Sequence, residues 1–357
     1  MAKTKTRKQK LIRGLAVSLV VILIFALMNF VAAIIIYDSL FPRFDYSSYD
    51  LALNIDYEEI KEEYPRREIG FYNDIRLQGY LYGEGNKGIV VVAPGLQSGA
   101  DDYLSLITGL VDMGWRVFSF DTTGSFRSEG GNSIGFCQET EDLLAGLKIL
   151  THDPELEGLP LFLIGHSRGG YAVACALESE YDIKGIATIS GANSPMEVTI
   201  DTSKNYVGPL AYMGYPFLYA YQAMKFGTDM TSQKASETIS ESTTPTLIIQ
   251  GTQDTVTPTD TCSIYAHKEE ISNPNVEYLV YSEELQNGHT SLLYSKDAVV
   301  YCEKVDKQYD ALNDKYPDGI PENIAEEFYS SIDSEKANEA NKDLIIKINS
   351  FFENILK

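Results

Sequence analysis

Short apolar runs and amphipathic stretches alternate along most of this chain. Apolar runs predict buried strands at residues 68–73, 75–83, 89–93, 115–121, 160–166, 184–190, 244–251 and 276–282. Stretches compatible with helices lie at residues 101–113, 138–150, 171–179 and 343–356. The first two strands meet at Asn73-Asp74 and predict a hairpin. The alternation that follows predicts an α/β fold with a doubly wound, mostly parallel sheet.

The pattern is different near the N-terminus, where residues 15–37 form an uncharged run of 23 residues. At about 1.5 Å per residue such a helix spans roughly 34 Å, enough for a hydrocarbon core of about 30 Å. The apolar region of a cleaved signal peptide is shorter, about 7 to 15 residues. We therefore expect an uncleaved, single-pass transmembrane signal anchor in the cell membrane. Cleavage near Ala32-Ala33, giving a secreted protein, is the alternative.

Charge sets the expected orientation of this segment. Residues 1–14 carry six Lys or Arg and no acid, although the whole chain has a net charge of −22. Basic flanks stay in the cytoplasm, so the acidic body is expected outside it. The acidic body also argues against nucleic acid as a partner, because phosphate binding needs basic residues. Four cysteines in a non-cytoplasmic body permit disulfides without predicting one.

These patterns divide the chain into parts. We expect a basic cytoplasmic tail at 1–14, the membrane anchor at 15–37, a stalk at 38–66 and the α/β domain at 67–357. An insertion at about 195–240 is aromatic in its first half, including Tyr206, Tyr212 and Tyr215. It predicts a helical cap that supplies an apolar pocket. A second helical insertion, at about 297–342, is rich in acids and lysines and is expected on the surface.

The strand at 160–166 leads into the most informative motif of the chain. Residues 161–170 read LFLIGHSRGG, and a small-residue helix follows. This is G-x-S-x-G in the order strand, sharp turn, helix, which exposes the serine hydroxyl at the carboxyl end of a sheet. Gly165 and Gly169 have no Cβ, so the helix can pass close to the strand. The pattern predicts that Ser167 is a nucleophile.

A serine nucleophile needs a base and a group that orients the base. His289 lies in a Gly-containing loop just after the last strand, and Asp254 lies three residues beyond the strand that ends at Gly251. Both loops belong to the carboxyl edge of the sheet, so His289 is the expected base and Asp254 the expected acid. Asp121 also ends a strand, but it precedes the serine and is expected to have a structural role. The order Ser, Asp, His is typical of this architecture.

The remaining part of such a site is a pair of N–H donors for the oxyanion. The backbone N–H groups of Arg168, which follows the serine, and of Leu96, which follows the strand at 89–93, are the expected donors. No cofactor or metal is expected, since there is no H-E-x-x-H and His and Cys do not cluster. Gly83, Gly85 and Gly88 spell G-x-G-x-x-G but open a strand instead of a helix, so they predict a loop.

Together the motifs VVVAPG, DTTGSFRSEGG, GHSRGG, QGTQDTVTP and NGH resemble the α/β-hydrolase superfamily over residues 67–295. The chain is most similar to the serine aminopeptidase and monoacylglycerol-lipase-like branch. That branch usually has His-Gly where this chain has Pro94-Gly95. It usually has Arg and Gly where this chain has Thr123 and Phe126. These departures leave the triad intact but make the substrate uncertain.

The resemblance and the candidate residues imply a serine hydrolase that acts through an acyl-enzyme. An apolar cap favours carboxylic esters, including lipid or acyl esters, as the substrate. A serine peptidase or aminopeptidase acting on short peptides is the alternative, and an acidic cluster in the cap would favour it. A non-catalytic binding module is a third interpretation, against which the presence of all three triad residues argues.

Overall fold

The computed structural model describes residues 7–357, and within them the side chains of residues 7, 8, 205 and 206 are not described. Part of the predicted basic tail and the side chain of Tyr206 therefore lie outside the described part. A single sheet of eight strands forms the centre, in the order β1-β2-β4-β3-β5-β6-β7-β8. The strands are Arg66–Asn73, Ile75–Tyr82, Ile89–Ala93, Arg116–Asp121, Leu161–His166, Ile183–Ile189, Thr246–Gly251 and Val276–Tyr281 for β1 to β8.

The predicted hairpin and parallel sheet are both confirmed. Strands β1 and β2 pair antiparallel around Asp74, whose φ is 57°, and β2 pairs antiparallel with β4. From β4 to β8 every pairing is parallel. All carboxyl ends of β3 to β8 therefore point to one edge, where loops from different parts of the chain can meet.

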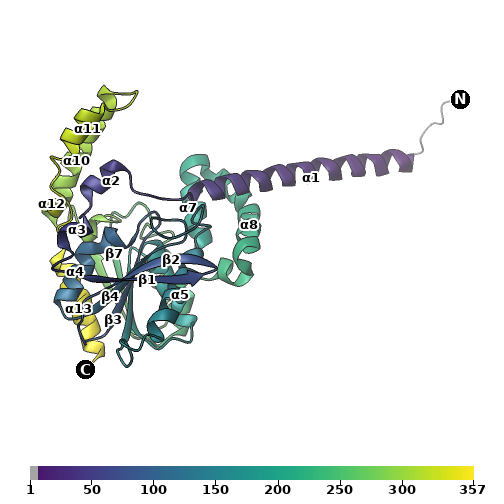
Figure 1. The fold of residues 1–357 in the computed structure, drawn as a ribbon. Helices are drawn as coiled ribbons and strands as arrows, with labels where there is room; N and C mark the ends of the chain where they lie inside the picture. The colour runs from purple at the N-terminus through teal and green to yellow at the C-terminus, as the bar shows by residue number, and fades with distance from the viewer. Residues whose placement is uncertain (1–6) are drawn as a thin grey trace.

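Apolar side chains cover both faces of the sheet, which is why its central strands are continuously hydrophobic. In β3, Ile89 and Val91 face one core, and Val90 and Val92 face the other. The first core contains α5 (Gln138–Thr151) and α6 (Arg168–Cys175). The second contains α4 (Leu104–Asp112) and α13 (Lys342–Ile355). This is the two-sided α/β arrangement that the sequence predicts (Figure 1).

Both insertions are helical. The first consists of α7 (Pro195–Val207), α8 (Ala211–Ser232) and α9 (Ala235–Glu241), and we call α7 and α8 the cap. In α8 a non-helical Gly227 separates two helical pieces. The second insertion consists of α10 (Lys296–Lys315), α11 (Glu322–Tyr329) and α12 (Ser334–Ala337), which extend from the opposite side of the body (Figure 1).

The N-terminal helix α1 (Arg7–Leu40) leaves the body beside the cap (Figure 1). Its stretch Gln9–Leu40 is long and apolar enough to cross a membrane. The segment that follows contains α2 (Ser48–Leu53) and α3 (Tyr57–Ile60) and packs against the body. Pro42 pairs with Asn132, Phe44 pairs with Ser125, and the rings of Phe44 and Phe126 lie 5.6 Å apart.

Candidate active site

Ser167 occupies a strained turn between β5 and α6. Its φ of 57° and ψ of −117° are unfavourable for a residue with a side chain, so the surrounding structure must hold it there. Close contacts between backbone segments around the turn hold Ser167 in this conformation. A Cβ on Gly165 would lie 2.1 Å from the oxygen of Gly169, and one on Gly169 would lie 2.2 Å from the oxygen of Ala93. The turn therefore presents the half-buried Ser167 at the carboxyl edge of the sheet.

Asp254 and His289 lie together on the loops after β7 and β8. The Nδ1 atom of His289 is 2.9 Å and 3.0 Å from the two carboxylate oxygens of Asp254. The His289 loop can approach because residue 251 is glycine: a Cβ there would lie 2.4 Å from the oxygen of Asn287. A carboxylate only accepts hydrogen bonds, so this contact assigns the proton of His289 to Nδ1 and leaves Nε2 free to accept one.

The carboxylate of Asp254 is buried and fully hydrogen-bonded. The N–H groups of Val256 and Thr257 donate to Oδ1, at 2.9 and 2.8 Å, while the Thr257 hydroxyl and the Gln250 amide donate to Oδ2. Burial by itself would raise the pKa of Asp254. The hydrogen bond and charge of His289, with the bonds from Thr257, instead lower that pKa to about 2. Asp254 therefore stays ionised at neutral pH and can stabilise a positively charged imidazole.

Ser167 and His289 lie at the same edge of the sheet, and His166, which precedes Ser167, contacts His289. The Nε2 atom of His166 is 3.1 Å from the backbone oxygen of His289, and the two imidazole rings are 4.9 Å apart. Within residues 7–357 the Ser167 hydroxyl makes no intramolecular hydrogen bond. Nucleophile and base often tighten their contact only when substrate binds. The structure thus pairs two of the three predicted residues, and the third lies at the same edge of the sheet.

His166 and Tyr103 are part of the site, and the sequence analysis did not identify their roles. The N–H of Gly95 donates to the Tyr103 hydroxyl at 2.9 Å, and that hydroxyl lies 2.8 Å from Nδ1 of His166. The backbone oxygen of His289 can only accept, so the proton of a neutral His166 lies on Nε2, and Nδ1 then accepts from the Tyr103 hydroxyl. Burial, with the nearby His289, lowers the pKa of His166 to about 3 and keeps it neutral. These hydrogen bonds connect the loop after β3, the end of β5 and the loop that carries His289.

The loop after β3 lies next to the serine, as the prediction of an oxyanion site requires. A Cβ on Gly95 would be 3.4 Å from the Ser167 Cβ. Neither Leu96 N–H nor Arg168 N–H donates a hydrogen bond to another described group outside the helices. The Arg168 N–H belongs to the first turn of α6, where helix N–H groups have no partner within the helix. Both donors are therefore available to a ligand.

The Arg168 side chain has a separate role behind the turn at Gly165–Gly169, which we call the elbow. It is buried and pairs through Nε with the buried carboxylate of Glu139 on α5, and its Nη2 donates to the Thr122 hydroxyl at 3.1 Å. Burial raises the pKa of Glu139 to about 7, against the opposing effect of Arg168. The pair connects the elbow with α5 and with the loop after β4.

Asp121, the other carboxylate at a strand end, has structural partners. Its oxygens accept from the Ala100 N–H, the Tyr80 hydroxyl and the Arg127 N–H. No histidine contacts it within the described residues. Burial raises the pKa of Asp121 to about 6. These contacts support Asp254 over Asp121 as the orienting acid.

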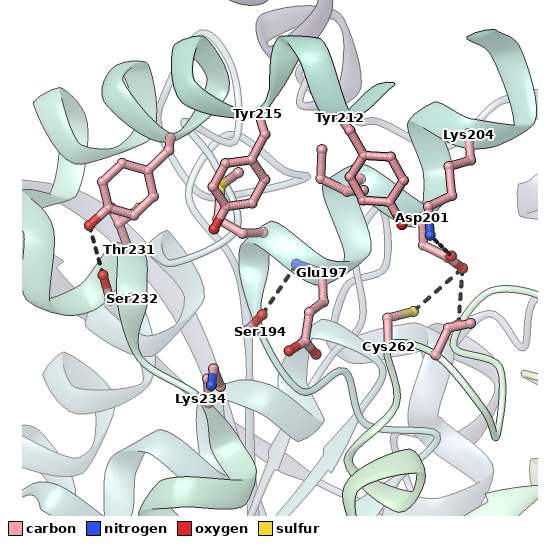
Figure 2. Close-up of a pocket in the computed structure, with 14 residues that line it drawn as sticks. Ser194, Glu197, Asp201, Lys204, Tyr212, Tyr215, Thr231, Ser232, Lys234 and Cys262 are labelled. Carbon is pink, nitrogen blue, oxygen red and sulfur yellow. Dashed lines mark hydrogen bonds and ion pairs between the residues drawn. The ribbon is translucent and has the colours of Figure 1, made fainter. Parts of the chain in front are cut away.

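The cap encloses a cavity of about 420 Å³ together with residues 261–262. Figure 2 shows the rings of Tyr212 and Tyr215 directed into it from α8, with Glu197 and Asp201 of α7 opposite. Glu197 accepts from the Asn193 amide at 2.8 Å, and Asp201 accepts from Thr261 at 3.1 Å. None of the five predicted site residues lines this cavity. The cavity therefore combines tyrosine rings with two carboxylates and two lysines, Lys204 and Lys234, and it does not contain the predicted site.

The thiols and the acidic residues do not form further centres. Cys137, Cys175, Cys262 and Cys302 are all free, and the first three are buried. Among the described residues no group of three or more His, Cys, Asp or Glu could hold a metal ion. The chemistry available at the sheet edge is therefore that of Ser167 and its neighbours.

Comparison with known proteins agrees with this fold. A family model described as serine aminopeptidase, S33, matches residues 84–207, which include the elbow but not Asp254 or His289. The esterase Pf2001 of Pyrococcus furiosus has a similar structure, with a TM-score of 0.52 and 18% identity over 73% of this chain and 94% of that one. The α/β hydrolase GrgF from a Penicillium species gives a TM-score of 0.50 and 15% identity over 70% and 98% of the chains. No curated relative matches. The predicted resemblance to the α/β-hydrolase superfamily and its serine aminopeptidase branch is confirmed.

Proposed function

We propose that this α/β-hydrolase is a membrane-anchored serine hydrolase that cleaves carboxylic esters outside the cytoplasm. Ser167 attacks the carbonyl carbon, His289 takes the serine proton through Nε2, and Asp254 orients the imidazole and stabilises its charge. The N–H groups of Leu96 and Arg168 bind the oxyanion. His289 returns the proton to the leaving alcohol, and water then releases the acid from Ser167. The contact between Asp254 and His289, beside the strained Ser167 turn, carries this proposal.

An active-site label tests the catalytic part. A fluorophosphonate probe should label the full-length protein, and the Ser167→Ala variant should lose the label. Ser190→Ala is the matched control, since Ser190 also ends a strand with a positive φ but contacts the backbone of β7. Labelling of Ser167→Ala at the wild-type rate would refute the assignment of the nucleophile.

The choice of ester over amide rests on the aromatic lining of the cap. A second candidate, a serine peptidase acting on short peptides, is favoured by Glu197 and Asp201, since carboxylates in a cap can hold a free amine. The match to a serine aminopeptidase family model also favours it. Turnover of p-nitrophenyl esters of increasing chain length should exceed turnover of aminoacyl amides. Faster turnover of the amides would replace the ester proposal by the peptidase.

The anchoring proposal rests on α1. The candidate cleavage point at Ala32-Ala33 lies inside a helix that packs on the cap, because Ala33 and Tyr37 are buried. Removal of the residues before it would uncover part of this contact. These contacts favour a retained anchor over a cleaved signal.

A further inference from the structure

Helix α1 is fixed to the cap at its C-terminal end. The ring of Tyr221 on α8 packs edge-on against the rings of Phe30 and Tyr37 on α1, at 6.3 and 5.6 Å. The Tyr221 hydroxyl donates to Asp38 at 2.8 Å, and the Lys225 ammonium lies 2.9 Å from the same carboxylate. The cap therefore has a defined position along the length of α1.

That position coincides with the expected outer boundary of a bilayer. A span needs about 20 residues to cross a hydrocarbon core of about 30 Å, and counting from Arg13, the last charge before the apolar run, it ends near Ala33. The two rings that Tyr221 contacts bracket this level. Tyrosine and lysine are typical residues of the membrane interface. Figure 1 shows α8 lying across α1 on the side of the body from which α1 leaves.

One face of α8 is apolar and uncovered. Met213 and Met224 are 59 and 73% exposed with the exposed Ala220 between them, and Leu210, just before the helix, is 64% exposed. The spacing places these four residues, which we call the outer cap face, on one side of the helix. The buried Leu218 lies on the side that packs on the body. The outer cap face is therefore directed away from the body.

We propose that the outer cap face inserts into the interfacial layer of the bilayer that α1 crosses. This rests on the proposed membrane anchor. A lipid surface is the occupant because α1 would hold the face at the bilayer boundary whether or not another protein is present. Neutral lipid suits it best, since the face carries no charge and the chain as a whole is acidic.

Docking would also narrow the substrate class. The cap begins at Pro195, three residues after Ala192, whose N–H donates to the backbone oxygen of Ser167 at 3.3 Å, so the cap starts beside the catalytic edge. A docked cap would hold that edge close to the lipid surface. The docked geometry therefore favours membrane-resident acyl esters over dissolved ones.

Depth-dependent quenching tests the docking without reference to catalysis. Full-length protein with Cys302→Ser and one introduced cysteine, at Met213 or Met224, is labelled with an environment-sensitive fluorophore and reconstituted in phosphatidylcholine vesicles. The native thiols that remain are buried. Spin-labelled phosphatidylcholine should quench both positions at least about twofold more than Val300→Cys on α10, which is 51% exposed on the far side of the body.

Leu23→Cys on α1 separates the two proposals. Quenching at Leu23 but not at Met213 or Met224 would overturn docking and leave the anchor intact. No quenching at any position would overturn both.

A charged variant tests the consequence for substrate. Met213→Asp with Met224→Asp should lower hydrolysis of an acylglycerol embedded in vesicles about tenfold and change hydrolysis of a dissolved short-chain ester less than about twofold. Val300→Asp should change neither. Equal effects on the two esters would overturn delivery from the membrane. If the wild type hydrolyses neither ester, the proposed hydrolase fails, and quenching still decides the docking.

Discussion

Asp254 and Asp121 both end strands of the same sheet, yet their surroundings give them opposite properties. Asp254 accepts from His289 and from the Thr257 turn, which holds its pKa at about 2. Asp121 accepts hydrogen bonds from two backbone N–H groups and one tyrosine hydroxyl, and burial raises its pKa to about 6. Only the first arrangement provides a permanent charge next to an imidazole. The identity of the acid thus follows from hydrogen-bond partners that strand position alone does not reveal.

Replacement of these two carboxylates should separate catalysis from structure. Asp254→Asn should lower ester turnover about 10³-fold or more, because the amide no longer fixes the His289 tautomer or stabilises its charge. Asp121→Asn should cost far less turnover and act mainly on stability. Initial rates, with circular dichroism to verify folding, measure both effects. A larger loss from Asp121→Asn would reverse the assignment.

The buried His166 should make the stability of the protein depend on pH. Its folded-state pKa, about 3, lies below the unfolded value of about 6.5, so the unfolded state binds the proton first as pH falls. The contribution is complete above pH about 6.5 and declines toward pH about 3. Between pH 7 and 5 the free energy of unfolding should fall by about 2 kcal/mol more in wild type than in His166→Gln.

Urea titrations of the detergent-solubilised full chain at the two pH values measure this difference. Identical pH dependence in the two proteins would show that His166 is not buried in its neutral form.

At the scale of secondary-structure elements, the elbow depends on tight contact between α6 and β3. Gly169→Ala would place its Cβ 2.2 Å from the Ala93 oxygen and 2.5 Å from the Pro94 oxygen. Backbone atoms cannot yield easily, so we expect a loss of about 3 kcal/mol in the free energy of unfolding. Gly131→Ala, with no atom within 4 Å of its Cβ, should change stability by less than about 0.5 kcal/mol. Equal melting temperatures for the two variants would contradict the elbow geometry.

The strands and the elbow could be predicted because their signals are local. The apolar runs gave β3 its observed bounds and the other strands bounds within two residues of those observed. Contacts made by distant residues that stand in no motif could not be predicted. Tyr103 meets His166 across 63 positions and Glu139 meets Arg168 across 29, and neither Tyr103 nor Glu139 stands in a motif. The sequence therefore identifies the residues that react better than those that position them.

At the scale of the whole molecule, the C-terminal end of the apolar helix α1 packs on the α/β body. Ala33, Tyr37 and Phe41 are at most 4% exposed, and the Phe136 N–H donates to the Tyr37 hydroxyl at 3.3 Å. The apolar run predicted a span, but run length alone does not show whether the helix contacts the body. If the span were cleaved near Ala33, the contact between Phe30 and Tyr221 would be lost. The structure gives a reason for keeping the helix.

The mature protein should therefore retain α1 and expose its body outside the cytoplasm. The mass of the intact protein, purified from the membrane fraction, should include the residues before Leu15. Protease added to intact cells should remove a tag placed after Lys357 and leave a tag placed before Met1 protected, since basic flanks stay inside. Lysed cells, in which both tags become accessible, are the control. A mature N-terminus at Ile34 would instead indicate a secreted protein. The outer cap face would then be exposed to water and would not contact lipid.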